Sequence, residues 1–179
     1  MKHYFLETSA FVKLFVKEEG TDFLIRLVEN VEDTRKLVSS FVALEVRSVF
    51  RKRLESGQLT EEQARSLVDA VAGEANRIVE HPANASVIEM ARYVLDRHAL
   101  STIQAIHLAT ALTARDILQL PDVVFVSADE QLIESAKHEG LEVLNPVTIK
   151  DEDFDKACEE ADVENDEEDD DEENNGNEA

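Results

Sequence analysis

One stretch near the amino terminus constrains the fold more than any other: residues 5–13, with the sequence FLETSAFVK. An apolar run that begins at Tyr4 ends here in a carboxylate, Glu7, and the hydroxyl residues Thr8 and Ser9 follow at once. Hydroxyl side chains accept hydrogen bonds from the first N–H groups of helices, so the pattern predicts a strand that runs into a helix capped by Thr8 or Ser9. A carboxylate would then lie at the carboxyl end of the first strand, where open α/β sheets bind ligands. The alternative is a solvated acid that stabilises the helix start by about 0.3–1 kcal/mol.

Segments with strand character alternate with helical ones over the first 150 residues. Short apolar runs predict strands at residues 4–6, 36–41, 77–81, 123–126 and 141–146. Apolar residues at helical spacing predict helices at 9–16, 21–31, 41–57, 60–76, 84–100, 101–118 and 130–139. This alternation predicts an α/β fold with a doubly wound parallel sheet and a helical insertion at about residues 41–80.

Capping residues mark several of the predicted helix ends. Ser39 or Ser40 is expected to open the helix at 41–57, and Gly57 is expected to end it. Thr60 and Gln63 have the spacing of a capping box, in which each residue's side chain accepts a hydrogen bond from the other's backbone N–H.

Acidic residues are concentrated at the carboxyl terminus. Residues 151–179 hold 17 of the 40 acidic residues and a single lysine, so most of the net charge of −22 lies there. Such a segment cannot bury enough apolar surface to offset the entropy of ordering. We therefore expect one domain at 1–150 and a largely disordered acidic tail at 151–179, which is either a solubilising appendage or a polyanion that competes with nucleic acid.

Cysteine content and hydropathy indicate where the protein acts. Cys158 is the only cysteine, which excludes an intrachain disulfide. The sequence has no signal-peptide pattern and no run of 18 or more uncharged apolar residues that could span a membrane. These features predict a cytoplasmic protein.

Two further acids join Glu7 as candidate site residues. Asp129 follows the strand predicted at 123–126, and Glu45 lies in an apolar helical segment just after the second predicted strand. An ionised side chain in such a segment is costly unless it is paired or metal-bound. Glu45 therefore either joins the other two acids, pairs with a nearby arginine such as Arg47, or lies on the exposed face. Three gathered carboxylates would hold Mg²⁺ or Mn²⁺, and such ions support phosphodiester hydrolysis.

Four segments, in this order and spacing, resemble a known family. They are FLETSAFVKLFVKEEG, VSSFVALEV, STIQAIHLATAL and VVFVSADEQLIESAKHEGLEVLNP. Together they resemble the PIN-domain nucleases over about residues 3–146, in particular the VapC-like ribonucleases of bacterial and archaeal toxin–antitoxin pairs. The resemblance implies a single three-layer α/β domain with a central, mostly parallel sheet flanked by helices, and metal-dependent cleavage of RNA by a cluster of acids.

The resemblance also implies which residues form the site. The first, second and fourth acids of the family fall on Glu7, Glu45 and Asp129, which would hold the metal ion, and the third falls on Gln104. The chain departs from the family at two of these positions, because Glu7 and Gln104 stand where aspartate is usual. Gln104 could ligate only through a neutral amide oxygen, which reduces the cluster from four formal charges to three.

Three more polar residues are expected to support the acids. Ser9 is expected to cap the first helix and orient Glu7, and Ser127 to orient Asp129. His107 lies three residues after Gln104, on the neighbouring part of the same helical face. It is either a structural histidine, as its match to the HLA segment of the family implies, or a substitute base or ligand.

RNA cleavage also requires cations that bind phosphates. The candidates are Lys13, close to the first acid in sequence, and Arg47, Arg51, Lys52 and Arg53, close to the second. The alternative is an ordinary solvated helix face, because residues 1–150 carry a net negative charge.

The leading hypothesis is therefore a Mg²⁺- or Mn²⁺-dependent endoribonuclease of the VapC type, for which the family implies a homodimer and an antitoxin partner. The second hypothesis is a PIN fold that has lost catalysis and binds RNA or protein, as the departures at Glu7 and Gln104 would allow. A receiver-like signalling domain is disfavoured because no acidic pair follows the first predicted strand. A dinucleotide-binding domain is disfavoured because the sequence has no G-x-G-x-x-G turn.

Overall fold

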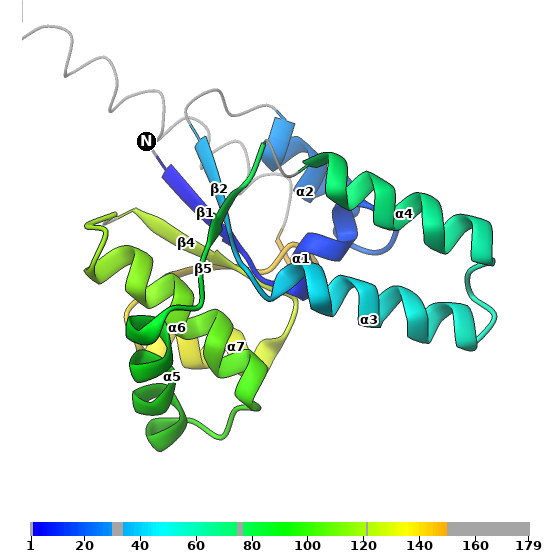
Figure 1. Ribbon diagram of the computed structural model, residues 1–179. Coiled ribbons are helices and arrows are strands. Elements are labelled where there is room, and N and C mark those ends of the chain that lie inside the picture. The colour runs from blue at the N-terminus through cyan, green and yellow to red at the C-terminus, as the bar shows by residue number, and fades with distance from the viewer. Residues whose placement is uncertain (1, 30–33, 75–76, 121, 150–179) are drawn as a thin grey trace, which may run out of the picture.

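The computed structural model describes residues 2–29, 34–74, 77–120 and 122–149 (Figure 1). The strands of this part of the chain form one sheet in the order β3-β2-β1-β4-β5, and every pairing in it is parallel. They are β1 (Lys2–Leu6), β2 (Thr34–Ser39), β3 (Val79–His81), β4 (Val123–Val126) and β5 (Glu142–Leu144). The predicted α/β fold is confirmed, whereas the predicted tail at 151–179 lies outside the described residues.

Helices cover both faces of the sheet, which gives the molecule three layers (Figure 1). One face carries α1 (Thr8–Phe11), α2 (Thr21–Glu29), α3 (Val42–Glu55) and α4 (Glu61–Gly73). The other face carries α5 (Ala85–Arg97), α6 (Thr102–Asp116) and α7 (Glu130–His138). Within the described ranges, no helix is both long and apolar enough to cross a membrane.

Alternate side chains of the strands enter two different cores. Phe5 and Phe125 face α5, α6 and α7, and their rings are stacked with centroids 5.5 Å apart. Leu6 and Val126 face α1, α2 and α3. All four side chains are fully buried, and each such burial contributes about 1.5–3 kcal/mol. β1 and β4 are thus held firmly side by side, and the residues that follow them start from a rigid edge.

The first helix differs from the prediction in length and in its cap. α1 contains only four residues and continues as a 3-10 helix, Val12–Leu14. The N-cap is Glu7, whose side chain accepts a hydrogen bond from the Ser9 N–H. The prediction that Thr8 or Ser9 would cap the helix is therefore wrong, because the helix begins one residue earlier than the apolar pattern indicated.

The helical insertion predicted at 41–80 is present as α3 and α4, which run side by side beyond the sheet in Figure 1. Gly57 ends the first of them with φ of 75°, and the Thr60–Gln63 capping box opens the second, as predicted. The predicted serine cap of α3 is wrong, since the N-cap is Phe41 and its side chain makes no capping hydrogen bond. The Ser40 hydroxyl instead accepts a hydrogen bond from the Ala83 N–H.

The order of the strands reverses next to β1. The chain moves from β1 to β2 and β3 on one side, then crosses to β4 and β5 on the other. At such a point the connections after the two central strands diverge and leave a crevice at the carboxyl edge of the sheet. Glu7 directly follows β1, and Ser127 and Asp129 follow β4. The fold therefore brings the first and last predicted acids to the same place.

Candidate active site

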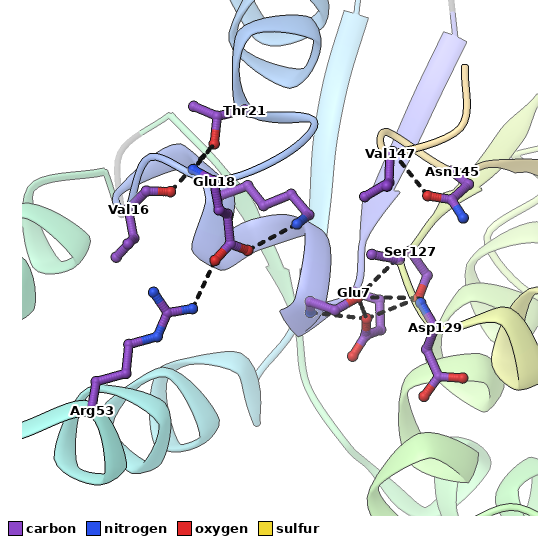
Figure 2. Close-up of polar contacts among 12 residues, drawn as sticks. Glu7, Val16, Glu18, Thr21, Arg53, Ser127, Asp129, Asn145 and Val147 are labelled. Atoms are coloured by element: carbon purple, nitrogen blue, oxygen red, sulfur yellow. Dashed lines mark hydrogen bonds and ion pairs between the residues drawn. The ribbon is translucent and has the colours of Figure 1, made fainter. Parts of the chain in front are cut away.

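The Glu7 carboxylate is buried and held by three donors on one oxygen. Its Oε2 atom accepts hydrogen bonds from Ser9 N at 2.9 Å, Ser9 Oγ at 2.5 Å and Ser127 Oγ at 3.0 Å. The backbone N–H of Glu7 donates to the carbonyl of Val126, which continues the β1–β4 pairing past the strand end. The position of the carboxylate is thus fixed by residues from the ends of both central strands (Figure 2).

Ser127 connects the two sides of this edge. Its hydroxyl donates to Glu7 and accepts a hydrogen bond from the Asp129 N–H at 3.1 Å (Figure 2). The Ser9 hydroxyl in turn accepts a hydrogen bond from Ala128 N at 2.8 Å. Ser9 and Ser127 therefore both contact Glu7, and Ser127 also contacts the backbone of Asp129.

Asp129 is the N-cap of α7 and has a hydrogen bond on each carboxylate oxygen. Oδ1 accepts from Leu132 N at 3.0 Å, as is usual for a capping aspartate. Oδ2 accepts from the Gln104 side-chain amide at 2.7 Å. The third and fourth positions of the predicted cluster are therefore in direct contact, through an N–H group and not through a shared ion.

Glu45, in the first turn of α3, is held by Thr8 and His107. Its Oε2 atom accepts a hydrogen bond from Thr8 Oγ1 at 2.5 Å and a second from His107 Nε2. Burial raises the pKa of Glu45, but the hydrogen bonds from His107 and Thr8 together outweigh it and lower the pKa below its ordinary value. Glu45 is therefore ionised at neutral pH, and its partners are His107 and Thr8, not the nearby Arg47 considered from the sequence.

The two ring nitrogens of His107 have different surroundings. A carboxylate can only accept, so Nε2 must carry the hydrogen that points at Glu45. Within the described residues, Nδ1 is buried and has no hydrogen-bond partner, and the ring lies edge-on to Phe5. The polar contacts of the ring are therefore made through Nε2, on the side of Glu45.

Glu7 and Glu45 each have one carboxylate oxygen without a hydrogen bond from the part of the chain that the structure describes. Among the described residues, no hydrogen bond reaches Oε1 of Glu7 or Oε1 of Glu45. Such oxygens, together with Asp129, have the donor chemistry that Mg²⁺ and Mn²⁺ prefer. The described residues nevertheless contain no group of three or more Asp, Glu, His or Cys side chains placed to hold an ion together. The donor set thus fits a hard cation, and side-chain movement is needed to gather it.

The predicted cations do not share one environment. The Lys13 side chain is buried, and its ammonium donates to Glu18 Oε1 at 2.8 Å. Glu18 also accepts a hydrogen bond from Arg53 at 2.8 Å (Figure 2). Burial raises the pKa of Glu18, but the hydrogen bonds from Lys13 and Arg53 lower it below the ordinary value. On α3, Arg51 pairs with Glu55 on its own helix at 2.8 Å.

Arg47 and Lys52 are the predicted cations whose side chains the structure exposes on α3 without an ion pair among the described residues. Both lie within two turns of Glu45 on the same helix. They are therefore better placed than Lys13 to meet a phosphate near the acids.

Sequence reasoning missed Thr8 as a partner of Glu45 and left two alternatives for His107. Both side chains are almost fully buried although they are polar. A histidine inside the helical run 105–114, which is otherwise Ala, Ile, Leu and Thr, is the one signal in the sequence, because a buried polar group needs a partner. Nothing in the sequence indicates that the partner of His107 is Glu45, which lies 62 residues away.

Solved structures contain chains with this fold. A chain of VapBC2 from Rickettsia felis, bound to a DNA fragment from its promoter, is 15% identical with a TM-score of 0.57, over 80% of this chain and 98% of that chain. A chain of FitAcB from Neisseria gonorrhoeae is 14% identical with a TM-score of 0.57, over 82% and 99%. A chain of DNA-bound VapBC from Salmonella typhimurium is 13% identical with a TM-score of 0.56, over 82% and 99%. None of the curated proteins compared with the chain matches it.

Fold and site together define an open, parallel α/β protein with acidic residues at the carboxyl ends of its central strands. Residues 4–137 match the family model of the PIN domain. The chain belongs to the PIN-domain family, and the resemblance inferred from the four sequence segments is confirmed.

Proposed function

We propose that this protein is a Mg²⁺- or Mn²⁺-dependent endoribonuclease of the VapC type and acts as the toxin of a toxin–antitoxin pair. The observation that carries the proposal is the arrangement of Glu7 and Glu45, each fixed through one oxygen with the other oxygen open, beside Asp129 at the carboxyl edge of the sheet. Membership of the PIN family supports it, and so does the likeness in fold to chains of VapBC complexes.

In this proposal Glu7, Glu45 and Asp129 hold the ion, and Ser9 and Ser127 keep Glu7 oriented through their hydrogen bonds. When bound, the ion supplies an activated water and neutralises charge on the phosphate. Glu45 needs no deprotonation to take part, because its pKa is already lowered. Exposed Arg47 and Lys52 on α3 would bind the RNA backbone next to the acids.

A partner protein is part of the same proposal. A groove of about 190 Å³ lies between α3, α4 and the sheet, lined mainly by the apolar side chains of Val42, Val46, Val68 and Val71. Val42 and Val46 lie on the same helix as Glu45, so a segment bound here would contact the helix that carries this acid. We propose that an antitoxin segment occupies this groove, and that the toxin is a cytoplasmic homodimer. A small open reading frame next to the gene, whose product copurifies with the chain, is the expected finding, and light scattering tests the dimer.

The experiment for catalysis is cleavage of a mixed RNA pool with Mg²⁺ or Mn²⁺ by the wild type and by Asp129→Ala. Glu130→Ala is the matched control, because it removes the exposed acid next in sequence. We expect cleavage by the wild type and the control, and none by Asp129→Ala or after chelation. Cleavage that survives both Asp129→Ala and chelation would overturn the carboxylate mechanism.

The second candidate function is a PIN domain without catalysis that binds RNA or protein. The contact between Gln104 and Asp129 favours it, because an amide occupies the position of a family acid. Gain of cleavage only in Gln104→Asp would support this reading and mark a degenerate site on a competent fold. Cleavage by the wild type would rule it out.

A further inference from the structure

Gln104 makes two hydrogen bonds of opposite character with its side chain. At the start of α6 the side-chain Oε1 atom of Gln104 accepts a hydrogen bond from Ser101 N at 2.9 Å. The backbone N–H of Gln104 donates to Ser101 Oγ at 3.4 Å, and the two hydrogen bonds together form a capping box. Its Nε2 atom donates to Asp129 Oδ2 at 2.7 Å. One residue therefore closes the end of α6 and reaches across to the N-terminus of α7.

The capping box determines which way the amide faces. A backbone N–H can only donate, so the amide oxygen must be the atom that faces Ser101. The NH₂ group then faces Asp129, and the only oxygen of the side chain is committed to the helix end. Gln104 thus presents a donor to the site, where an ion ligand would have to present an acceptor.

We propose that Gln104 is a positioning residue for Asp129 and not an ion ligand, so that any divalent ion at this edge of the sheet would be bound without it. The side-chain N–H of Gln104 donates to Asp129 Oδ2. A carboxylate in the place of this amide would need a cation between it and Asp129, because the two negative charges repel each other. With Leu132 N on Oδ1, Asp129 is held in place before any ion arrives. This inference rests on the proposed function only in taking the carboxylates as the ion ligands.

Gln104→Glu separates the two roles of the side chain. Glutamate serves as well as glutamine in a capping box, so the bond to Ser101 is retained. The atom that faces Asp129 becomes a carboxylate oxygen, however, and two like charges would stand in hydrogen-bond contact. The variant should therefore need a cation at this point, whereas the wild type does not.

The helix α4 supplies a matched control. Gln63 occupies the same position in the Thr60 capping box, with its Oε1 accepting from Thr60 N at 2.9 Å, and its side chain is exposed. Gln63→Glu makes the same chemical change at a helix start where no hydrogen bond to a carboxylate is present. Any effect of the glutamate on the cap itself appears in this variant too.

The experiment measures thermal unfolding of the full chain in chelator and in Mn²⁺, together with Mn²⁺ binding by electron paramagnetic resonance. In chelator, Gln104→Glu is expected to unfold about 3 °C or more below the wild type, and Gln63→Glu within about 1 °C of it. Mn²⁺ should restore Gln104→Glu, or be required for it to fold, and should bind it at least about tenfold more tightly than the wild type. Equal Tm values in chelator, equal Mn²⁺ affinities, or the same shifts in Gln63→Glu would overturn the proposal.

A second variant tests the ligand question directly and does not depend on the stability of the first. Gln104→Met removes the amide and so the hydrogen bond to Asp129, which is present without an ion. We therefore expect its Tm in chelator to fall below that of Gln63→Met, which loses only the equivalent cap. Equal Tm values for Gln104→Met and Gln63→Met in chelator, with a loss of Mn²⁺ affinity in Gln104→Met alone, would show that the amide acts only as an ion ligand and would overturn the proposal. No RNA is present in these measurements, so failure of the nuclease proposal and failure of this one are distinguishable.

Discussion

Replacing Thr8 by valine tests the account of Glu45 with little change in shape. The substitution removes the 2.5 Å hydrogen bond from Thr8 Oγ1 to Glu45 Oε2 in a position that is 6% exposed. A hydrogen bond to a charged group contributes about 1.5–3 kcal/mol, and Glu45 keeps its second donor, His107. We therefore expect a loss of about 2 kcal/mol in the free energy of unfolding, or about 4–8 °C in Tm for a chain of this size.

The assay is urea unfolding in chelator at neutral pH and again below pH 4.5. The folded-state pKa of Glu45 is lowered below its ordinary value of 4.5, so the stability from its ionised form is present above that value. It is lost as the pH falls through the folded pKa, and the difference between Thr8→Val and the wild type should shrink there. Thr113→Val is the control, because the buried Thr113 hydroxyl has no hydrogen-bond partner within the described residues, and this variant should be as stable as the wild type or more so. A Thr8→Val protein as stable as the wild type, or a difference independent of pH, would refute the reasoning.

Two further predictions concern stability away from the candidate active site. Gly20→Ala is expected to lower the free energy of unfolding by about 2–4 kcal/mol, because φ is +86° and a Cβ would lie 2.6 Å from a backbone carbonyl oxygen. Gly57→Ala should lower it by only about 1 kcal/mol, because φ is +75° but a Cβ there would meet open space. Thermal unfolding of both variants measures the difference. Equal losses would contradict the role of the backbone contact. Glu139→Gln should cost about 1–3 kcal/mol, because the buried carboxylate accepts hydrogen bonds from His98 Nε2 at 2.7 Å and Arg97 Nε at 3.0 Å. Burial raises the pKa of Glu139, but these hydrogen bonds outweigh burial and lower the pKa below its ordinary value of 4.5. The loss of stability in Glu139→Gln should therefore be present above pH 4.5 and disappear as the pH falls through the lowered pKa. Parallel pH profiles of stability would argue against this ion pair.

Much of the fold could be predicted because its signals are local. The apolar run at 123–126, the capping box at Thr60 and Gln63, and the stop at Gly57 are each readable within a few residues, and all were confirmed. The cap of the first helix could not be predicted, because Glu7 and Ser9 can each cap a helix start. Only the pairing of β1 with β4 determines where that helix begins.

The candidate site was only partly predictable because its contacts join distant parts of the chain. The acids after β1 and β4 could be located from strand ends alone, since parallel strands share a carboxyl edge. The bond between Gln104 and Asp129 spans 25 residues, and the bond between Glu45 and His107 spans 62. Periodicity indicates that such polar side chains need partners, but which donor meets which acceptor follows from the packing of α6 against the sheet.

The most direct test of the central claim is the rate of RNA cleavage by Glu7→Gln in saturating Mn²⁺. Glutamine keeps the length of the side chain and an oxygen that can accept from Ser9 and Ser127, but it removes the charge that would hold the ion. We predict cleavage by the wild type that stops in chelator, and a rate at least about 100-fold lower in Glu7→Gln. Cleavage by Glu7→Gln at the wild-type rate would contradict the account.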